Sequence, residues 1–132
     1  MSIAAYKRTI SDTEAPRQIE RRVLVQVTSR LESGHADYDA AETSGERLEI
    51  LSNGLREDVW QNERVWLAFK ADLAEPENAL SPDLRAGLLS LAMWVERHSQ
   101  GVLAGEKKVK PLIDINKTII NGLAGRAFST TE

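Results

Sequence analysis

The feature that most restricts the fold of this chain is the spacing of its apolar residues, which recur at intervals of three and four over most of its length. This spacing places apolar side chains on one side of an α-helix. Strict alternation joined by two-residue hairpin turns, the pattern of paired strands, does not occur. The sequence therefore predicts an all-α protein.

End signals divide the apolar pattern into four predicted helices. Pro16 suits a first helical turn, and Gly34 can close the helix that follows it. Thr43 and Glu46 match a capping box at the start of the second helix. The predicted helices cover 16–33, 45–74, 82–104 and 111–125.

The third helix has the clearest boundaries. Ser81 can cap its start, Pro82 fits its first position, and Asp83 lies near its positive end. Gly105 can end it. Because most connections between the four helices are short, we expect a compact antiparallel bundle.

The whole chain is predicted to form one helical domain. It has 132 residues, and its 42% hydrophobic content is enough to close one core. Gly, Asp, Ser and Thr cluster over 34–44, which predicts a linker. A short N-terminal segment could pack through Ile3 and Tyr6, and 126–132 is expected to be a loose tail.

Composition limits the classes of partner. The 17 Lys and Arg residues against 20 Asp and Glu residues give a net charge of −3, which disfavours a large surface for nucleic acid or anionic membrane. No apolar run is long enough to cross a bilayer or to serve as a secretion signal. The absence of cysteine removes disulfides and thiolate zinc sites and fits the cytoplasm. We expect a cytoplasmic protein with a protein partner.

No catalytic, metal or cofactor site is legible in the sequence. The two histidines, His35 and His98, lie far apart and match no metal-binding spacing. His98 ends an apolar stripe, where a hydrogen-bonded structural role is the better interpretation, and His35 is expected in a loop. No phosphate-binding glycine motif occurs. The chain is therefore predicted not to be an enzyme.

Two asparagines lie among apolar residues of predicted helices. Asn116 falls near the centre of the apolar arc in "LIDINKTIINGL", and Asn62 lies between Val59 and Trp66 on the second helix. An unpartnered buried amide costs about 1–3 kcal/mol, so each needs a fixed partner. Two interpretations stay open: the amides tie helices or loops together inside the monomer, or they bind a partner helix and fix its register.

The three tryptophans all lie on the two middle helices. Trp66 and Trp94 lie on or beside the apolar stripes, where core packing is the ordinary role. Trp60 lies away from its helix's stripe and must contact either another helix or a partner.

Three stretches together resemble the FlaF family of alphaproteobacterial flagellar biosynthesis regulators. The resemblance covers nearly the whole chain, although 34–44 carries little of it. It rests on "AYKRTISDTEAPRQIERR", "NERVWLAFKADLAEPENALSPDLRAGLLSLAMWVERH" and "LIDINKTIINGL", taken as an ordered set.

The resemblance implies a non-enzymatic cytoplasmic protein that binds flagellin before secretion and promotes its production and export. It implies action alongside the translational regulator FlbT and near the flagellar export gate. Regulation of translation through RNA, directly or through FlbT, is the alternative, and the charge balance disfavours direct RNA binding. The resemblance also implies a client with amphipathic terminal segments that are poorly ordered before assembly.

A chaperone for such a client needs an apolar surface for a helix. We expect this surface to be a groove built from the second, third and fourth helices. Which residues contact flagellin does not follow from the resemblance and is predicted from the stripes, the amides and the tryptophans. The predicted partner-binding residues are Val59, Trp60, Asn62, Trp66, Leu91, Trp94, Val95, Leu112, Ile115, Asn116, Ile119 and Leu123.

Overall fold

A computed structural model describes residues 16–76, 78 and 80–123, apart from the side chains of 16–19 and of Leu123. This part of the chain contains helices and connections but no strand, which confirms the predicted all-α class. The elements are α2 (Pro16–Ala40), α3 (Ser44–Ile50), the π-helical turn η1 (Leu51–Leu55), α4 (Arg56–Ala74), α5 (Pro82–Leu103) and α6 (Lys110–Leu123).

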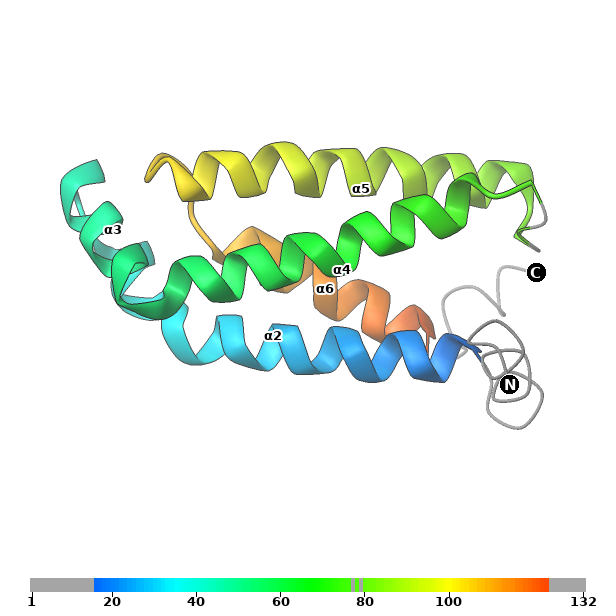
Figure 1. Ribbon diagram of the computed structural model, residues 1–132, viewed down its shortest axis with the longest axis horizontal. Helices are drawn as coiled ribbons and strands as arrows, with labels where there is room; N and C mark the ends of the chain where they lie inside the picture. The colour runs from blue at the N-terminus through cyan, green and yellow to red at the C-terminus, as the bar shows by residue number, and fades with distance from the viewer. Residues whose placement is uncertain (1–15, 77, 79, 124–132) are drawn as a thin grey trace, which may run out of the picture.

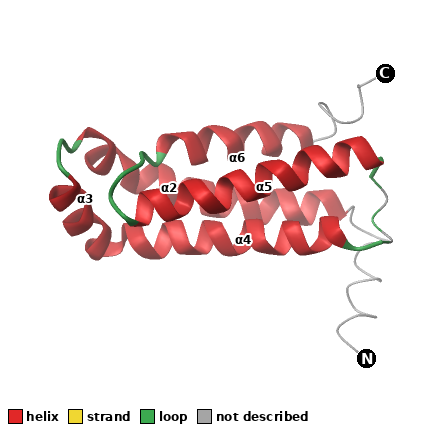
Figure 2. Ribbon diagram, turned by 90° about the horizontal axis from the view of Figure 1, so that it is seen from above, coloured by secondary structure: helices red, strands yellow, loops and turns green. Residues whose placement is uncertain are grey.

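Four long helices lie lengthwise beside one another, and α3 turns away at one end (Figure 1). Helices α2, α4, α5 and α6 alternate in direction along the chain, as the colours of Figure 1 show. Helix α4 packs extensively on α5, and α2 packs on α6 and on α4, whereas α5 and α6 meet at few positions. The view from above shows the same four helices (Figure 2). The predicted antiparallel bundle is confirmed.

The predicted end signals act as expected at three helix ends. The Thr43 hydroxyl accepts a hydrogen bond from the Glu46 amide at 3.1 Å, and the Ser81 hydroxyl accepts one from the Leu84 amide at 3.3 Å. Gly105 follows α5 with φ of 76°. A Cβ there would lie 3.1 Å from the Ser44 carbonyl oxygen, so both backbone conformation and space favour glycine.

Two predicted boundaries are wrong. Helix α2 continues past Gly34 to Ala40, so most of the predicted 34–44 linker is helix. The reason is Tyr38, which lies two turns after Leu31, continues the buried face and is itself fully buried. The predicted second helix, 45–74, is broken at Gly54, whose φ of 122° separates α3 from α4.

Other expectations fall outside the described residues. These are the N-terminal segment with Ile3 and Tyr6 and the tail over 126–132.

The core runs along the axis of the bundle and draws side chains from every long helix. Its members are apolar and less than a tenth exposed, which is the burial that stabilises a bundle of amphipathic helices. The core residues are Leu24, Val27, Leu31, Tyr38, Leu51, Leu55, Val59, Trp66, Ala92, Val95, Val102, Val109, Leu112, Ile113 and Ile119.

The end of α2 holds the turn between α5 and α6. The buried Tyr38 hydroxyl lies 2.6 Å from the Val102 carbonyl oxygen and 2.8 Å from that of Lys107. Burial raises the pKa of Tyr38, so the hydroxyl keeps its donor proton. The Asp39 carboxylate accepts hydrogen bonds from the backbone amides of Val109 and Lys110 at 2.7 and 3.0 Å. Residues of α2 thereby position the start of α6.

Candidate partner-binding site

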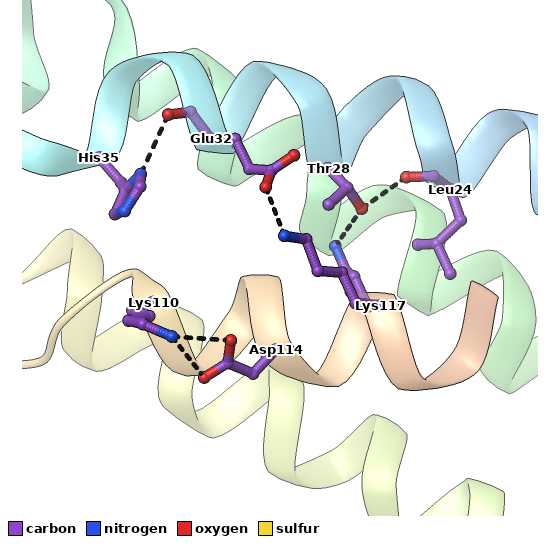
Figure 3. Close-up of polar contacts among 8 residues, drawn as sticks. Leu24, Thr28, Glu32, His35, Lys110, Asp114 and Lys117 are labelled. Atoms are coloured by element: carbon purple, nitrogen blue, oxygen red, sulfur yellow. Dashed lines mark hydrogen bonds and ion pairs between the residues drawn. The ribbon is translucent and has the colours of Figure 1, made fainter. Parts of the chain in front are cut away.

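Asn116 lies in the centre of the bundle and bonds to two other helices. Its side-chain oxygen accepts a hydrogen bond from the Trp66 indole N–H at 2.9 Å. Its amide group donates to the Asn62 side-chain oxygen at 2.7 Å and to the Thr28 hydroxyl at 3.0 Å. The Thr28 hydroxyl donates in turn to the Leu24 carbonyl oxygen at 2.7 Å (Figure 3). The amide of Asn116 is therefore fully bonded within the fold.

The polar layer, as we call it, consists of Thr28, Asn62, Ser99 and Asn116, one residue from each long helix. All four are 3% exposed or less. Ser99 on α5 lies level with Asn62 on α4. The residue after Ser99, Gln100, donates a hydrogen bond at 3.1 Å to Glu63, the residue after Asn62. The layer is incompletely bonded: the Asn62 amide nitrogen and the Ser99 hydroxyl have no hydrogen-bond partner among the described residues.

The structure places most of the predicted partner-binding residues in the core. The two amides, Asn62 and Asn116, are fully buried and take the internal role that the sequence left open. Contact of these residues with a client would require the bundle to open. The others that are fully or nearly fully buried are Val59, Trp66, Val95, Leu112 and Ile119.

The remaining predicted residues are closer to the surface. Trp60 is 43% exposed, and Leu91, Trp94 and Ile115 are partly buried. The side chain of Leu123 lies outside the described residues. The structure therefore brings Asn62, Trp66 and Asn116 together, but inside the bundle and not along an open groove.

Exposed apolar residues gather instead on the outside of α4 and α5. Trp60 and Leu67 lie two turns apart on α4, both 43% exposed, and Met93 on α5 is 47% exposed. We call this the outer α4–α5 face. Sequence reasoning missed Leu67 and Met93. The seven-residue interval between Trp60 and Leu67 was a usable signal, because it puts both on one side of a helix.

Two shallow hollows lie end to end on this face. One contains Trp60 and the other contains Met93, with residues of both helices in each wall. The first is lined by Arg56, Glu57, Trp60 and Leu103, and the second by Glu63, Lys70, Met93, Glu96, Arg97 and Gln100.

Charged groups around the outer α4–α5 face are unevenly paired. Lys70 bonds to the Glu96 carboxylate at 2.8 Å. The Arg64 guanidinium lies over the Trp60 ring, 4.8 Å from its centroid, in a cation–π contact. Arg56 and Arg97 are exposed and form no ion pair with any described residue.

A smaller aromatic site lies on the other side of α5. Trp94 stacks on His98 with ring centroids 4.7 Å apart. The His98 ring nitrogen Nε2 donates to the Lys108 carbonyl oxygen at 2.7 Å. The predicted structural role of His98 is confirmed, and its hydrogen bond holds the turn after α5.

The surface between α2 and α6 is mainly charged. Lys117 and Glu32 form an ion pair at 2.6 Å across the two helices, and Lys110 pairs with Asp114 within α6 at 3.0 Å (Figure 3). The hydrogen bond to Glu32 raises the pKa of Lys117. This side resembles an ordinary solvated surface, unlike the outer α4–α5 face.

The described part of the chain contains no group of three or more His, Asp or Glu side chains placed to hold a metal ion. None of its helices combines the length and the apolar character needed to cross a bilayer.

Comparison with known proteins gives one family. Residues 2–123 match the family described as Flagellar protein FlaF, which covers nearly the whole chain. Comparison with curated proteins and comparison with solved structures gave no match.

Proposed function

Because the chain belongs to the FlaF family of flagellar proteins, we propose that it is a flagellin-binding export chaperone that works by apolar contact without catalysis. The observation that carries this proposal is the outer α4–α5 face, where large apolar side chains stay exposed on a bundle whose core is already closed. Large exposed apolar patches on soluble helical proteins commonly bind other helices.

The client fits the physical requirement of such a face. We propose that flagellin termini reach the chaperone as amphipathic, poorly ordered segments. A segment that orders on binding loses conformational entropy, so its affinity is moderate for the area covered. Moderate affinity suits a chaperone that must release its client at the export gate.

The proposed client surface differs from the groove expected from the sequence. The amides Asn62 and Asn116 hold the bundle together, so client binding is assigned to exposed apolar residues. The proposal retains Trp60 from the original set and adds Leu67 and Met93. Trp94, Leu91 and Ile115 are partly buried and are the next predicted residues to test.

Co-purification with flagellin tests the proposal. The full-length chain is mixed with full-length flagellin and with flagellin lacking its C-terminal helix, and the complex is isolated by size-exclusion chromatography. We expect a complex with the full-length client and a weaker one with the truncated client. Absence of any complex with full-length flagellin would reject the chaperone function.

A salt titration separates this function from direct RNA binding. Apolar capture of a helix changes little between 50 and 200 mM salt, whereas binding through several phosphates falls by about 10³–10⁵-fold over the same range. RNA binding with that salt dependence, and no flagellin complex, would support translational regulation instead.

A further inference from the structure

We infer that the outer α4–α5 face binds one amphipathic client helix that carries carboxylates beside its apolar stripe. The inference rests on the proposed chaperone function and specifies which surface and which client chemistry are used. It follows from the exposed apolar residues of the face and from two arginines, one in each hollow, that have no ion-pair partner among the described residues.

The apolar residues have the layout of a seat for one helix. Trp60 and Leu67 are two turns apart on α4, Trp60 lines one hollow, and Met93 lines the other from α5. A helix laid along the two hollows would offer apolar anchors at i, i+3, i+4 and i+7 to these side chains. Residues of α4 and α5 line both hollows, so the client helix would pack on these two helices as a third.

Two arginines mark the length of this seat. Arg56 lines the hollow with Trp60, and Arg97 lines the hollow with Met93. Contacts of Glu63 with Gln100 and of Lys70 with Glu96 place Arg97 level with α4 residues about ten to thirteen positions after Arg56. At 1.5 Å per residue, the backbone positions of the two arginines are about 15–20 Å apart along the bundle, or roughly three to four helical turns.

The six charged residues that line the two hollows have no net charge, but they differ in whether they have a side-chain partner. Of its acidic residues, Glu96 is paired with Lys70, Glu63 accepts from Gln100, and Glu57 accepts from Gln61. Arg56 and Arg97 have no such partner among the described residues. A chain of net charge −3 therefore presents unpaired guanidinium groups beside its exposed apolar side chains. Guanidinium pairs best with carboxylate, so the complementary helix is acidic on its flanks.

The same face is less suited to RNA. Base stacking needs an open aromatic ring face, and Arg64 already covers one face of Trp60. Leu67 and Met93 offer apolar contact but no stacking platform.

The test measures Kd for purified flagellin and for peptides of its two terminal segments by isothermal titration calorimetry. Leu67→Gln with Met93→Gln is expected to weaken binding by about tenfold or more. Val23→Gln is the matched control, because Val23 is an exposed apolar residue, 39% exposed, on α2. Circular dichroism verifies that each variant is folded.

A charge cycle tests the acidic flanks. Arg56→Glu with Arg97→Glu is expected to weaken binding of the peptide by about tenfold, whereas reversal of two exposed α2 arginines, Arg21→Glu with Arg30→Glu, leaves it unchanged. A peptide whose carboxylates are replaced by amides should bind the wild-type protein more weakly than the original peptide. This amide peptide should bind the Arg56→Glu, Arg97→Glu protein as well as it binds the wild-type protein.

The outcomes separate the inference from the proposed function. If wild-type protein binds no flagellin, the proposed function fails and the inference fails with it. If wild-type protein binds but the outer-face variants bind equally well, the function stands and the surface assignment is wrong. Loss of RNA binding instead of flagellin binding in the arginine variants would also overturn the inference.

Discussion

Asn62 and Asn116 lie fully buried at the centre of the bundle, while Trp60, Leu67 and Met93 remain more than 40% exposed on its outside. The polar residues fix the arrangement of helices through named hydrogen bonds, whereas each of the apolar residues keeps more than 40% of its surface exposed. The comparison shows that a residue whose polarity does not fit its helix face marks a specific contact. It does not tell whether that contact lies inside the fold or with a partner protein. Here the unusual polar residues serve folding, and the unusual apolar ones are the proposed contacts with a partner.

Asn116→Ala is expected to have the largest effect on stability. The change leaves the Trp66 indole N–H and the Asn62 oxygen without their partner and opens a small cavity. We expect the free energy of unfolding to fall by about 2–4 kcal/mol, measured by urea denaturation. The control is Asn121→Ala on the exposed side of α6, which should change stability by about 0.5 kcal/mol or less. Equal effects would show that the polar layer does not hold the bundle.

Ser99→Ala is expected to have a smaller effect of the opposite sign. The buried Ser99 hydroxyl has no hydrogen-bond partner among the described residues, so its removal relieves a desolvation cost. Stability should stay constant or rise by up to about 1 kcal/mol in the same denaturation experiment. Ser90→Ala, on the exposed side of α5, controls for the helix propensity of alanine. A clear loss would mean that Ser99 is bonded in solution and that the layer is complete.

Trp60→Gln is expected to change stability much less than Asn116→Ala. The Trp60 ring is 43% exposed, and its contact with Arg64 is worth about 0.5–1 kcal/mol at an exposed site. Thermal unfolding followed by circular dichroism should therefore shift only slightly, while flagellin binding weakens. A loss of several kcal/mol would place Trp60 among the residues that hold the fold and would remove the contrast with Asn116.

The helices were predictable because spacing and caps are local signals. Thr43, Ser81 and Gly105 act at the ends where the sequence placed them. The end of α2 was not predictable from composition, because the burial of Tyr38 against α5 and the turn that follows it outweighs the turn-forming residues around it. The break at Gly54 depends on a backbone angle that the helical period cannot report.

The candidate site was harder to predict than the fold. The sequence marks Asn62 and Asn116 as needing partners, but that each is the other's partner depends on how α4 and α6 lie across the bundle. Trp60 could be recognised because it leaves the apolar stripe of its helix. The seven-residue interval from Trp60 also points to Leu67, whereas Met93 could not be recognised, because it joins this face only once α4 and α5 are placed side by side.

The carboxylate of Asp39 caps the start of α6 from 70 residues earlier in the chain. Helix α6 has no acidic residue in its own first turn, so it borrows this anion from the far end of α2. Helix α6 therefore gains its full stability only when α2 extends as far as Asp39. Shortening α2 by its final turn would remove this anion and weaken a helix that follows it much later in the chain.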